Sequence, residues 1–232
     1  MLILALVAAG CAGDLNEPVL HSAASLTDVV PDLVDAFGVT GGRTDFRLNV
    51  GGSSALAAQI GDGAPSGVFL AADEVTMGIA VDSGEASDPV VFARNRLVLV
   101  RRPRADVTGL ADLAERGLAV GLCAPSVPCG SLARSELAAR SIDPAVDTEE
   151  PDVRSLLAKV VAGELDAALV YATDAIVGGE AIEVVPIDLA GTTPYLAAVV
   201  GSDPPSGSTE FVAFLRSPEA QQVFAAAGFE AP

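Results

Sequence analysis

The sequence predicts an α/β protein with mostly parallel sheets, and three observations indicate this architecture. Short apolar runs that are typical of buried strands alternate along the chain with segments whose apolar residues recur at helical spacing. Such a strand-and-helix order is typical of parallel sheets covered by helices. Half of the 232 residues are hydrophobic and 19% are charged, which supplies a substantial packed core. The length accommodates one large domain or two smaller lobes.

The expected strands are short apolar runs. They cover residues 19–23, 46–50, 68–70, 97–100, 118–122, 167–171, 183–187 and 196–200. Most are continuously apolar, which indicates burial on both faces. The second differs, because Phe46, Leu48 and Val50 alternate with polar residues and predict a strand with one buried face.

The expected helices follow these strands, and several begin at recognisable N-terminal signals. Ser25 precedes apolar residues at helical spacing. Asp73 and Asp152 are suitable N-caps. Ser217, followed by Pro218 at the first helical position, predicts the start of the last helix. The expected helical segments are residues 25–37, 55–60, 73 onward, 132–140, 152–161, 210–215 and 217 onward.

The composition argues against several classes of function. The chain has 13 basic and 31 acidic side chains and a net charge of −18, which opposes binding to nucleic-acid phosphates. It has no Trp and 2 Tyr, so that a site stacking bases or sugars on aromatic rings is poorly supplied. With 1 His and 3 Cys, a multi-histidine zinc site is not expected.

The first residues have features of an export signal. Residues 2–9 form an unbroken apolar run that is shorter than the about 20 residues needed to span a bilayer and fits a signal peptide. The small residues before Cys11 resemble a bacterial lipoprotein box. We therefore expect residues 1–17 to be a signal and tether, and the protein to be extracytoplasmic, in the periplasm or at the cell surface, with a lipid anchor on Cys11. The run lacks a positively charged start, and a buried first strand is the alternative.

Cys123 and Cys129 lie close together in the sequence. In an oxidising compartment, two cysteines at this spacing are expected to form a disulfide. The alternative is a pair of free thiols buried as small apolar side chains. With Cys11 as the lipid anchor, the pairing accounts for all 3 cysteines.

Four expected helices begin with small or polar residues just after a strand or loop. These starts are at residues 23–25, 51–54, 127–130 and 151–153. The first turn of a helix leaves its N–H groups unpaired and carries a partial positive charge, so that an anion can bind there. In open α/β sheets, such ends lie where ligands bind.

A series of short segments extends in unbroken order from about residue 18 to the C-terminus. The segments are residues 23–28 (Ala-Ala-Ser-Leu-Thr-Asp), 51–60 (Gly-Gly-Ser-Ser-Ala-Leu-Ala-Ala-Gln-Ile), 63–73, 92–95, 127–130, 170–175, 217–221 and 228–229. Together they resemble the periplasmic molybdate-binding proteins of ABC importers. The resemblance implies a two-lobed type II binding protein with a hinge of two crossing strands. One lobe would hold residues 18–94 and 198–232, and the other residues 95–197.

The resemblance also implies a set of oxyanion ligands. Ser25 and Ser53 would donate from hydroxyl and backbone amide, Cys129 and Val153 from the backbone amide, and Tyr171 from its hydroxyl. The neighbouring Ser54 is an alternative to Ser53, and the two serines could instead serve only as helix caps. The ligand would be molybdate or tungstate, without a cofactor or further metal. The partners would be the permease subunits of an ABC importer, and the protein would act as a monomer.

Other functions remain as alternatives. Within the same fold, the solute could be sulfate, another oxyanion or a ferric ion, although Tyr171 and Tyr195 alone supply few anionic ligands for iron. A small α/β enzyme is a different class. The sequence has no Gly-x-Ser-x-Gly, phosphate-loop or His-Glu-x-x-His pattern, so we do not expect an enzyme.

Overall fold

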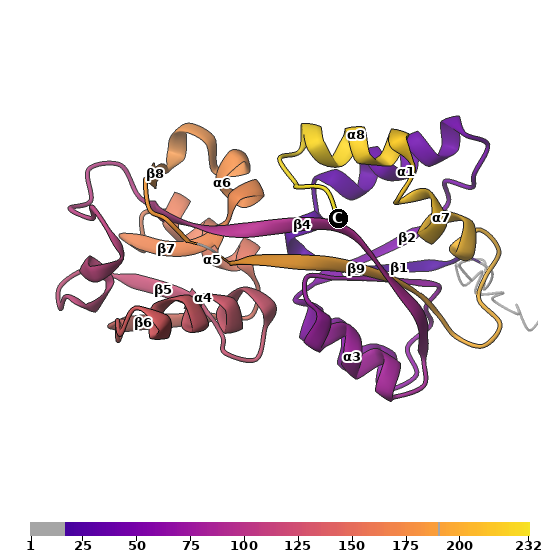
Figure 1. Ribbon diagram of the computed structural model, residues 1–232, viewed down its shortest axis with the longest axis horizontal. Coiled ribbons are helices and arrows are strands. Elements are labelled where there is room, and N and C mark those ends of the chain that lie inside the picture. Colours follow the sequence, from indigo (N-terminus) through magenta and orange to yellow (C-terminus); the bar gives the residue numbers. More distant parts are fainter. Residues whose placement is uncertain (1–16, 190) are drawn as a thin grey trace, which may run out of the picture.

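Two long antiparallel strands, β4 (Ala86–Arg101) and β9 (Thr192–Val200), connect the two halves of the molecule. The structure is a computed structural model that describes residues 17–189 and 191–232. Figure 1 shows that both strands extend from one lobe into the other. We call the half that contains the C-terminus the first lobe and the other half the second lobe. These two strands occupy the place expected for the hinge.

One continuous sheet path links the lobes in the order β2-β1-β3-β9-β4-β7-β5-β6. In the first lobe, β1 (Val19–Ala23) pairs in parallel with β2 (Arg47–Gly51) and β3 (Val68–Ala71). The two crossing strands are antiparallel to their neighbours. Parallel strands therefore end at the same edge of the sheet, which places the loops after them side by side.

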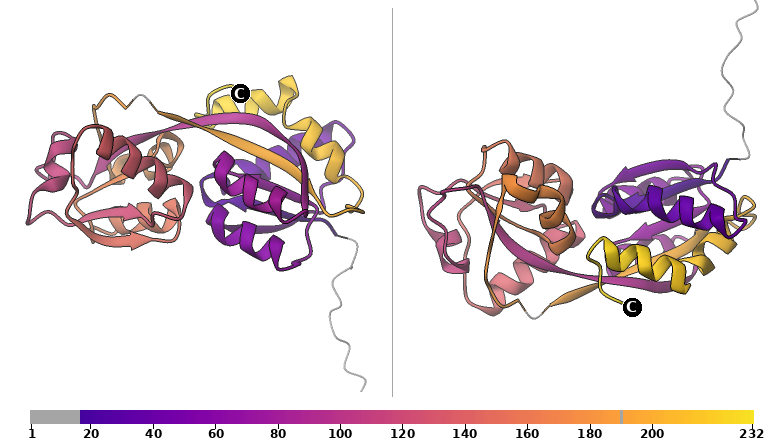
Figure 2. Two further views of the ribbon diagram at one scale, coloured as in Figure 1. Left: turned by 60° about the horizontal axis from the view of Figure 1, so that its bottom comes forward. Right: turned by 90° about the horizontal axis from the view of Figure 1, so that it is seen from above.

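Helices cover both faces of the first-lobe sheet, as Figure 2 shows. A core on one face lies beneath α1 (Val29–Val39), α7 (Ser208–Phe214) and α8 (Pro218–Ala226). A separate core on the other face lies beneath α2 (Ser53–Gly61) and α3 (Glu74–Asp82). A short 3-10 turn, η1 (Ala24–Leu26), follows β1 directly.

The second lobe has one hydrophobic core, which includes Leu99, Leu122, Leu156 and Leu169. Its strands are β5 (Val120–Cys123), β6 (Val146–Glu150), β7 (Ala167–Tyr171) and β8 (Glu183–Val185). Its helical segments are η2 (Leu110–Ala114), α4 (Pro128–Ala139), α5 (Val153–Val161), α6 (Ala172–Gly178) and η3 (Gly179–Ala181). As in the first lobe, the loops that follow parallel strands lead directly into helices.

The α/β architecture predicted from the sequence is confirmed, with differences in individual elements. The helix expected at 25–37 is divided into the η1 turn and α1. The strand expected at 97–100 is the end of the much longer β4. The strand β6 and the helix α6 were not predicted from the sequence. The sheets are mixed rather than mostly parallel, because the crossing strands add antiparallel pairs to each lobe.

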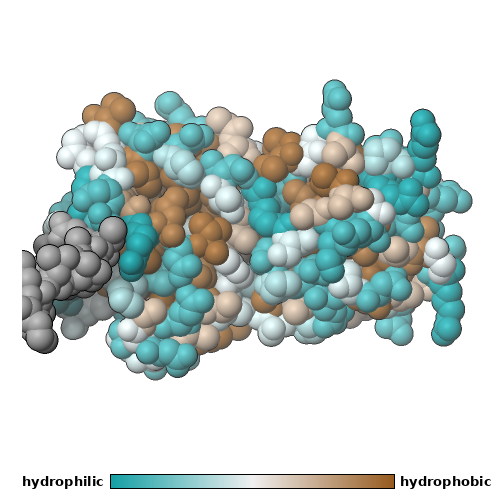
Figure 3. Space-filling model, turned by 180° about the vertical axis from the view of Figure 1, so that it is seen from behind, coloured by the Kyte–Doolittle hydropathy of each residue, from teal (hydrophilic) through white to brown (hydrophobic). Residues whose placement is uncertain are grey.

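Hydrophobic and hydrophilic side chains are interspersed over the face of the molecule shown in Figure 3. The most exposed apolar side chains, Val39, Val75 and Ile176, lie on three different helices. No helix among the described residues combines the length and apolar character needed to cross a bilayer. Cys11 and the predicted signal segment lie outside the described residues, so the lipidation site stays a prediction.

Candidate functional site

A small cavity of about 20 Å³ lies between the lobes. A cavity that holds one water needs roughly 10–15 Å³ by such a measure, and sites for drug-sized ligands need about 300 Å³ or more. The cavity therefore suits a single small ion and is too small for a sugar or an amino acid. Its lining is Ala23, Ala24, Ser25, Gly52, Ser53 and Ala72 from the first lobe and Val127, Pro128, Cys129, Asp152, Val153 and Tyr171 from the second.

All five residues implied by the resemblance line this one cavity, although they are spread over 147 positions between Ser25 and Tyr171. Three of them lie at helix starts. Ser53 is the first residue of α2, Cys129 the second of α4, and Val153 the first of α5. The backbone N–H groups at these positions have no partner within their own helix, and each helix start carries about half a positive charge. The three starts together favour an anion.

The Ser53 hydroxyl is held as a donor toward the cavity. Its Oγ accepts a hydrogen bond from the Ala72 backbone N–H at 3.2 Å, which leaves the serine proton free for another acceptor. The Ser54 hydroxyl donates instead to the Ser126 carbonyl of the second lobe at 2.6 Å, and Ser54 does not line the cavity. The geometry therefore favours Ser53 over Ser54 as the site residue.

The Tyr171 hydroxyl has an unusual environment. The side chain is 1% exposed, and within the described part of the chain its hydroxyl forms no hydrogen bond of good geometry, although the Tyr195 hydroxyl lies nearby. Burial raises the pKa of Tyr171 well above its ordinary value, so the group stays a protonated donor. Leaving a buried hydroxyl unpaired costs about 1–3 kcal/mol, a cost that a ligand oxygen in the cavity would remove.

Beneath the cavity, Ser25 contacts a second tyrosine. Ser25 Oγ lies 2.7 Å from the Tyr195 hydroxyl, which in turn lies 3.5 Å from Asn95 Nδ2. Tyr195 and Asn95 belong to the two crossing strands. From the sequence, Tyr195 was expected at most to be an iron ligand, and Asn95 had no predicted role of its own. No local pattern indicates the contact, because Ser25 and Tyr195 are 170 positions apart.

The carboxylates near the cavity are engaged elsewhere. Asp152 lines the cavity, but its oxygens accept hydrogen bonds from the backbone and hydroxyl of Ser155 at 2.9 and 3.0 Å. Asp174 is fully buried, and its Oδ1 lies 2.9 Å from Arg154 Nε. Burial raises the pKa of Asp174 to about 7 despite this cation. Among the described lining residues there is no Arg, Lys or His, so the cavity wall consists of uncharged donors and one helix-capping carboxylate.

Polar contacts join the lobes beside the cavity. Arg154 of the second lobe forms an ion pair with Asp28 of the first lobe as well as with Asp174. Gly52 approaches the carbonyl oxygen of Pro151 so closely that an added Cβ would lie 2.5 Å from it. Together with the contact between Ser54 and Ser126, these interactions join the lobes next to the cavity-lining residues Ser53, Val127 and Val153.

A disulfide supports one wall of the cavity. Cys123 ends β5 and Cys129 lies in the first turn of α4, and the structure joins the two by a disulfide. The bond closes the loop that carries Val127 and Pro128, both of which line the cavity. It thereby restrains the position of the Cys129 amide.

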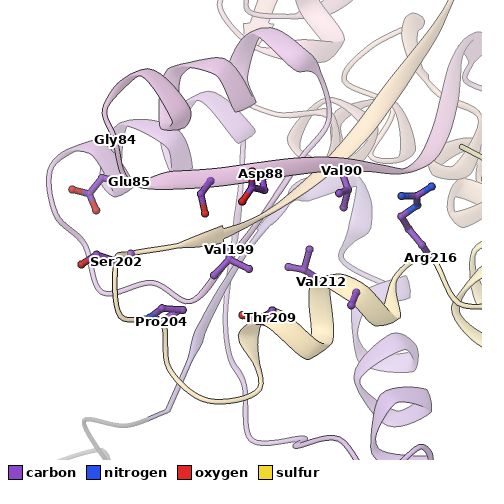
Figure 4. Close-up of a pocket in the computed structure, with 13 residues that line it drawn as sticks. Gly84, Glu85, Asp88, Val90, Val199, Ser202, Pro204, Thr209, Val212 and Arg216 are labelled. Atoms are coloured by element: carbon purple, nitrogen blue, oxygen red, sulfur yellow. The ribbon is translucent and has the colours of Figure 1, made fainter.

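A larger cavity of about 780 Å³ lies elsewhere, in the first lobe. Figure 4 shows it between the start of β4 and α7, with Glu85 and Asp88 on one side and Arg216 near the other end. None of the unpaired buried polar atoms found in the described residues belongs to its lining. The small cavity between the lobes, which does contain such an atom, is the better candidate for the functional site.

Comparison with known proteins identifies the family. The sequence profile of the bacterial extracellular solute-binding proteins matches residues 19–230. The chain belongs to this family. The molybdate-binding protein ModA of Mycobacterium tuberculosis is 31% identical to this solute-binding protein over 249 aligned positions, which cover 100% of the chain and 95% of the relative.

Two solved structures share the fold of this solute-binding protein. The periplasmic molybdate-binding protein of Azotobacter vinelandii has a TM-score of 0.75 at 21% identity, with 93% of this chain and 100% of that chain covered. The sulfate-binding protein SubI of Mycobacterium tuberculosis has a TM-score of 0.80 at 19% identity, with 93% of this chain and 87% of that chain covered. Both likenesses establish the two-lobed type II architecture. As a member of an extracellular family, the protein is extracytoplasmic.

Proposed function

We propose that this solute-binding protein captures molybdate, and tungstate as well, in the cavity between its lobes and delivers it to the permease of an ABC importer. The observation that carries the proposal is the buried, unpaired Tyr171 hydroxyl in a cavity of about 20 Å³ at three helix starts. The full-length similarity to ModA supports molybdate as the solute. The proposed role involves no chemical conversion of the ion.

The proposed donors are those of Ser25, Ser53, Cys129, Val153 and Tyr171. A hydrogen bond to a charged group contributes about 1.5–3 kcal/mol. Several such bonds sum to on the order of 10 kcal/mol, before the cost of ordering the complex, which suffices for micromolar or tighter binding. Uncharged donors can therefore hold a dianion without a cation in the cavity wall.

The net charge of −18 does not prevent this binding. Repulsion between the ion and exposed carboxylates is screened beyond about 8 Å at physiological salt. The donors in the cavity act at hydrogen-bond distance and are shielded from solvent, so their attraction dominates once the ion is bound. The surface charge should mainly slow the encounter of the anion with the protein.

The predominance of donors in the cavity wall also selects among anions. Molybdate, tungstate and sulfate carry no proton near neutral pH, whereas phosphate keeps one and needs an acceptor for it. Of the nearby carboxylates, Asp152 accepts hydrogen bonds from Ser155, and Asp174 forms an ion pair with Arg154 and does not line the cavity. We therefore expect the protein to discriminate against phosphate. An iron site is disfavoured, because iron needs several anionic ligands and the described lining offers only Tyr171 and Asp152, of which Asp152 accepts from Ser155.

The two lobes supply the mechanism of capture. Ser25 and Ser53 belong to the first lobe, and Cys129, Val153 and Tyr171 to the second. An ion bonded to both sets stabilises the closed form relative to an open one. The closed form would then dock, as a monomer tethered by a lipid on Cys11, onto the permease.

Calorimetric titration with molybdate, tungstate, sulfate and phosphate tests the proposal. We expect molybdate and tungstate to bind at micromolar concentrations or below, and phosphate to bind far more weakly. A preference for sulfate would show that the proposed solute is wrong and would leave the proposed donor site unchanged. A protein that binds phosphate as tightly as molybdate, or binds none of the four, would contradict the proposal.

A further inference from the structure

A chain of buried hydrogen bonds lies beneath the cavity. Asn95 Nδ2 is 2.9 Å from Thr173 Oγ1 and 3.5 Å from the Tyr195 hydroxyl, which is 2.7 Å from Ser25 Oγ. All four side chains are at most 4% exposed, so these groups have little access to water. The directions of these hydrogen bonds therefore depend on the protein itself.

The orientation of Asn95 sets these directions. The Arg96 backbone N–H donates to Asn95 Oδ1 at 2.9 Å, so the amide nitrogen must face Thr173 and Tyr195. An amide NH₂ group can only donate, and the Tyr195 oxygen therefore accepts from Asn95. The proton of Tyr195 is then available for Ser25 Oγ at 2.7 Å. When Tyr195 donates that proton to Ser25 Oγ, Ser25 is the acceptor in this pair and its own proton is left for the cavity.

Ser53 has the same arrangement on the other side of the cavity, because its Oγ accepts from the Ala72 backbone N–H. Both serine hydroxyls thus have an acceptor site already occupied by a neighbour. We propose that Asn95, acting through Tyr195, is a positioning residue that makes the Ser25 hydroxyl a donor and thereby excludes oxyanions that carry a proton. This inference rests on the proposed function, in which Ser25 contacts the bound ion.

The donor role of Ser25 affects the selectivity between protonated and deprotonated oxyanions more than the affinity for molybdate. A protonated oxygen placed against Ser25 would meet a hydrogen rather than a lone pair, and its O–H group would stay unpaired in a buried site. Without the Tyr195 hydroxyl, Ser25 could rotate and accept that proton. Fully deprotonated molybdate needs only donors, so it would lose little from the same change.

The two tyrosines of the chain supply a matched pair of variants. Tyr195→Phe keeps the ring that packs against Phe92, Phe229 and Tyr171 and removes only the hydroxyl. Tyr171→Phe removes the hydroxyl proposed to contact the ion directly. Asn95→Ala removes the amide that orients Tyr195. For each variant and the full-length wild type, the molybdate dissociation constant is measured by calorimetry and that of phosphate by its competition with bound molybdate.

We expect Tyr195→Phe to narrow the preference for molybdate over phosphate by about tenfold, or ~1.4 kcal/mol, mainly through tighter phosphate binding. Asn95→Ala should shift the ratio in the same direction. Tyr171→Phe should weaken both ions and leave their ratio within about twofold, since it removes a donor that serves both. Thermal melting with and without molybdate establishes that each variant is folded.

The outcomes separate the inference from the proposed function. Suppose that Tyr195→Phe leaves the preference for molybdate over phosphate unchanged or increases it, while Ser25→Ala weakens molybdate binding. This result would overturn the inference and leave the proposed function standing. An unchanged ratio in Asn95→Ala alone would overturn the role of Asn95. Absence of molybdate binding in the wild type, or unchanged binding in Ser25→Ala, would overturn the proposed function and the inference with it.

Discussion

Replacing Ser53 with alanine removes one hydroxyl donor from the cavity and leaves the helix start in place. Ser53 is 2% exposed, and its oxygen accepts from the Ala72 N–H at 3.2 Å. Loss of a hydrogen bond to a charged group costs about 1.5–3 kcal/mol, so the dissociation constant of molybdate should rise by about 10- to 150-fold. The Ala72 amide also loses its partner, which should lower the free energy of unfolding by about 1 kcal/mol.

Ser54→Ala is the matched control for this variant. The Ser54 hydroxyl donates to the Ser126 carbonyl across the lobes, a bond between neutral groups outside the cavity. Its loss should weaken molybdate binding by less than about tenfold. Calorimetric titration of the two variants and the wild type gives the comparison. Unchanged binding in Ser53→Ala, or a larger loss in Ser54→Ala, would refute the assignment of Ser53 as a ligand.

Three further predictions concern the surroundings of the cavity. Replacing Cys123 and Cys129 together with serine should lower the free energy of unfolding by about 2 kcal/mol and weaken molybdate binding, as measured by urea denaturation and calorimetry; full retention of both would contradict the role of the disulfide. Asp28→Asn breaks the ion pair with Arg154 between the lobes and should raise the molybdate dissociation constant by about two- to fivefold, less at high salt. Burial raises the pKa of Asp174 to about 7 from an ordinary value of 3.8. The folded state therefore binds more protons than the unfolded state between these values, and the stability of the wild type relative to Asp174→Asn should fall by up to ~4 kcal/mol as the pH rises from about 4 to about 8. A pH-independent difference between these two proteins in urea denaturation would contradict the account of Asp174.

Much of the site could be predicted because its signals are local. Ser53, Cys129 and Val153 all lie within the first two residues of a helix, and N-caps, glycines and prolines mark helix starts in the sequence. Tyr171 is the last residue of a continuously apolar strand, so its position marks the carboxyl end of that strand, where ligands bind in α/β sheets. The resemblance then selected particular residues within these segments, and the structure brings all five to one cavity.

The rest depends on contacts between distant segments. The contact of Ser25 with Tyr195 and the ion pair of Asp28 with Arg154 join residues 170 and 126 positions apart. Neither has a local signal. The carboxylates beside the cavity illustrate the same limit, because their partners Ser155 and Arg154 decide whether they can accept a proton from a ligand.

Some elements were missed for identifiable physical reasons. The first half of β4 contains Pro89 and the positive φ of Asp88, which lie within a register shift between Ser87 and Val90, so this part has the composition of a loop. The pattern of Leu48 and Val50 predicted a buried face, yet they are 41% and 40% exposed. Because β2 is the outermost strand of the sheet, these side chains lack a covering layer.

A crystal structure with tungstate would locate the bound ion, because the anomalous scattering of tungsten gives its position without reference to the protein. We expect one strong peak between the lobes, within hydrogen-bond reach of Ser25, Ser53 and Tyr171 and of the amides of Cys129 and Val153. A peak in the larger first-lobe cavity, or an ion coordinated by carboxylates or arginines, would contradict it.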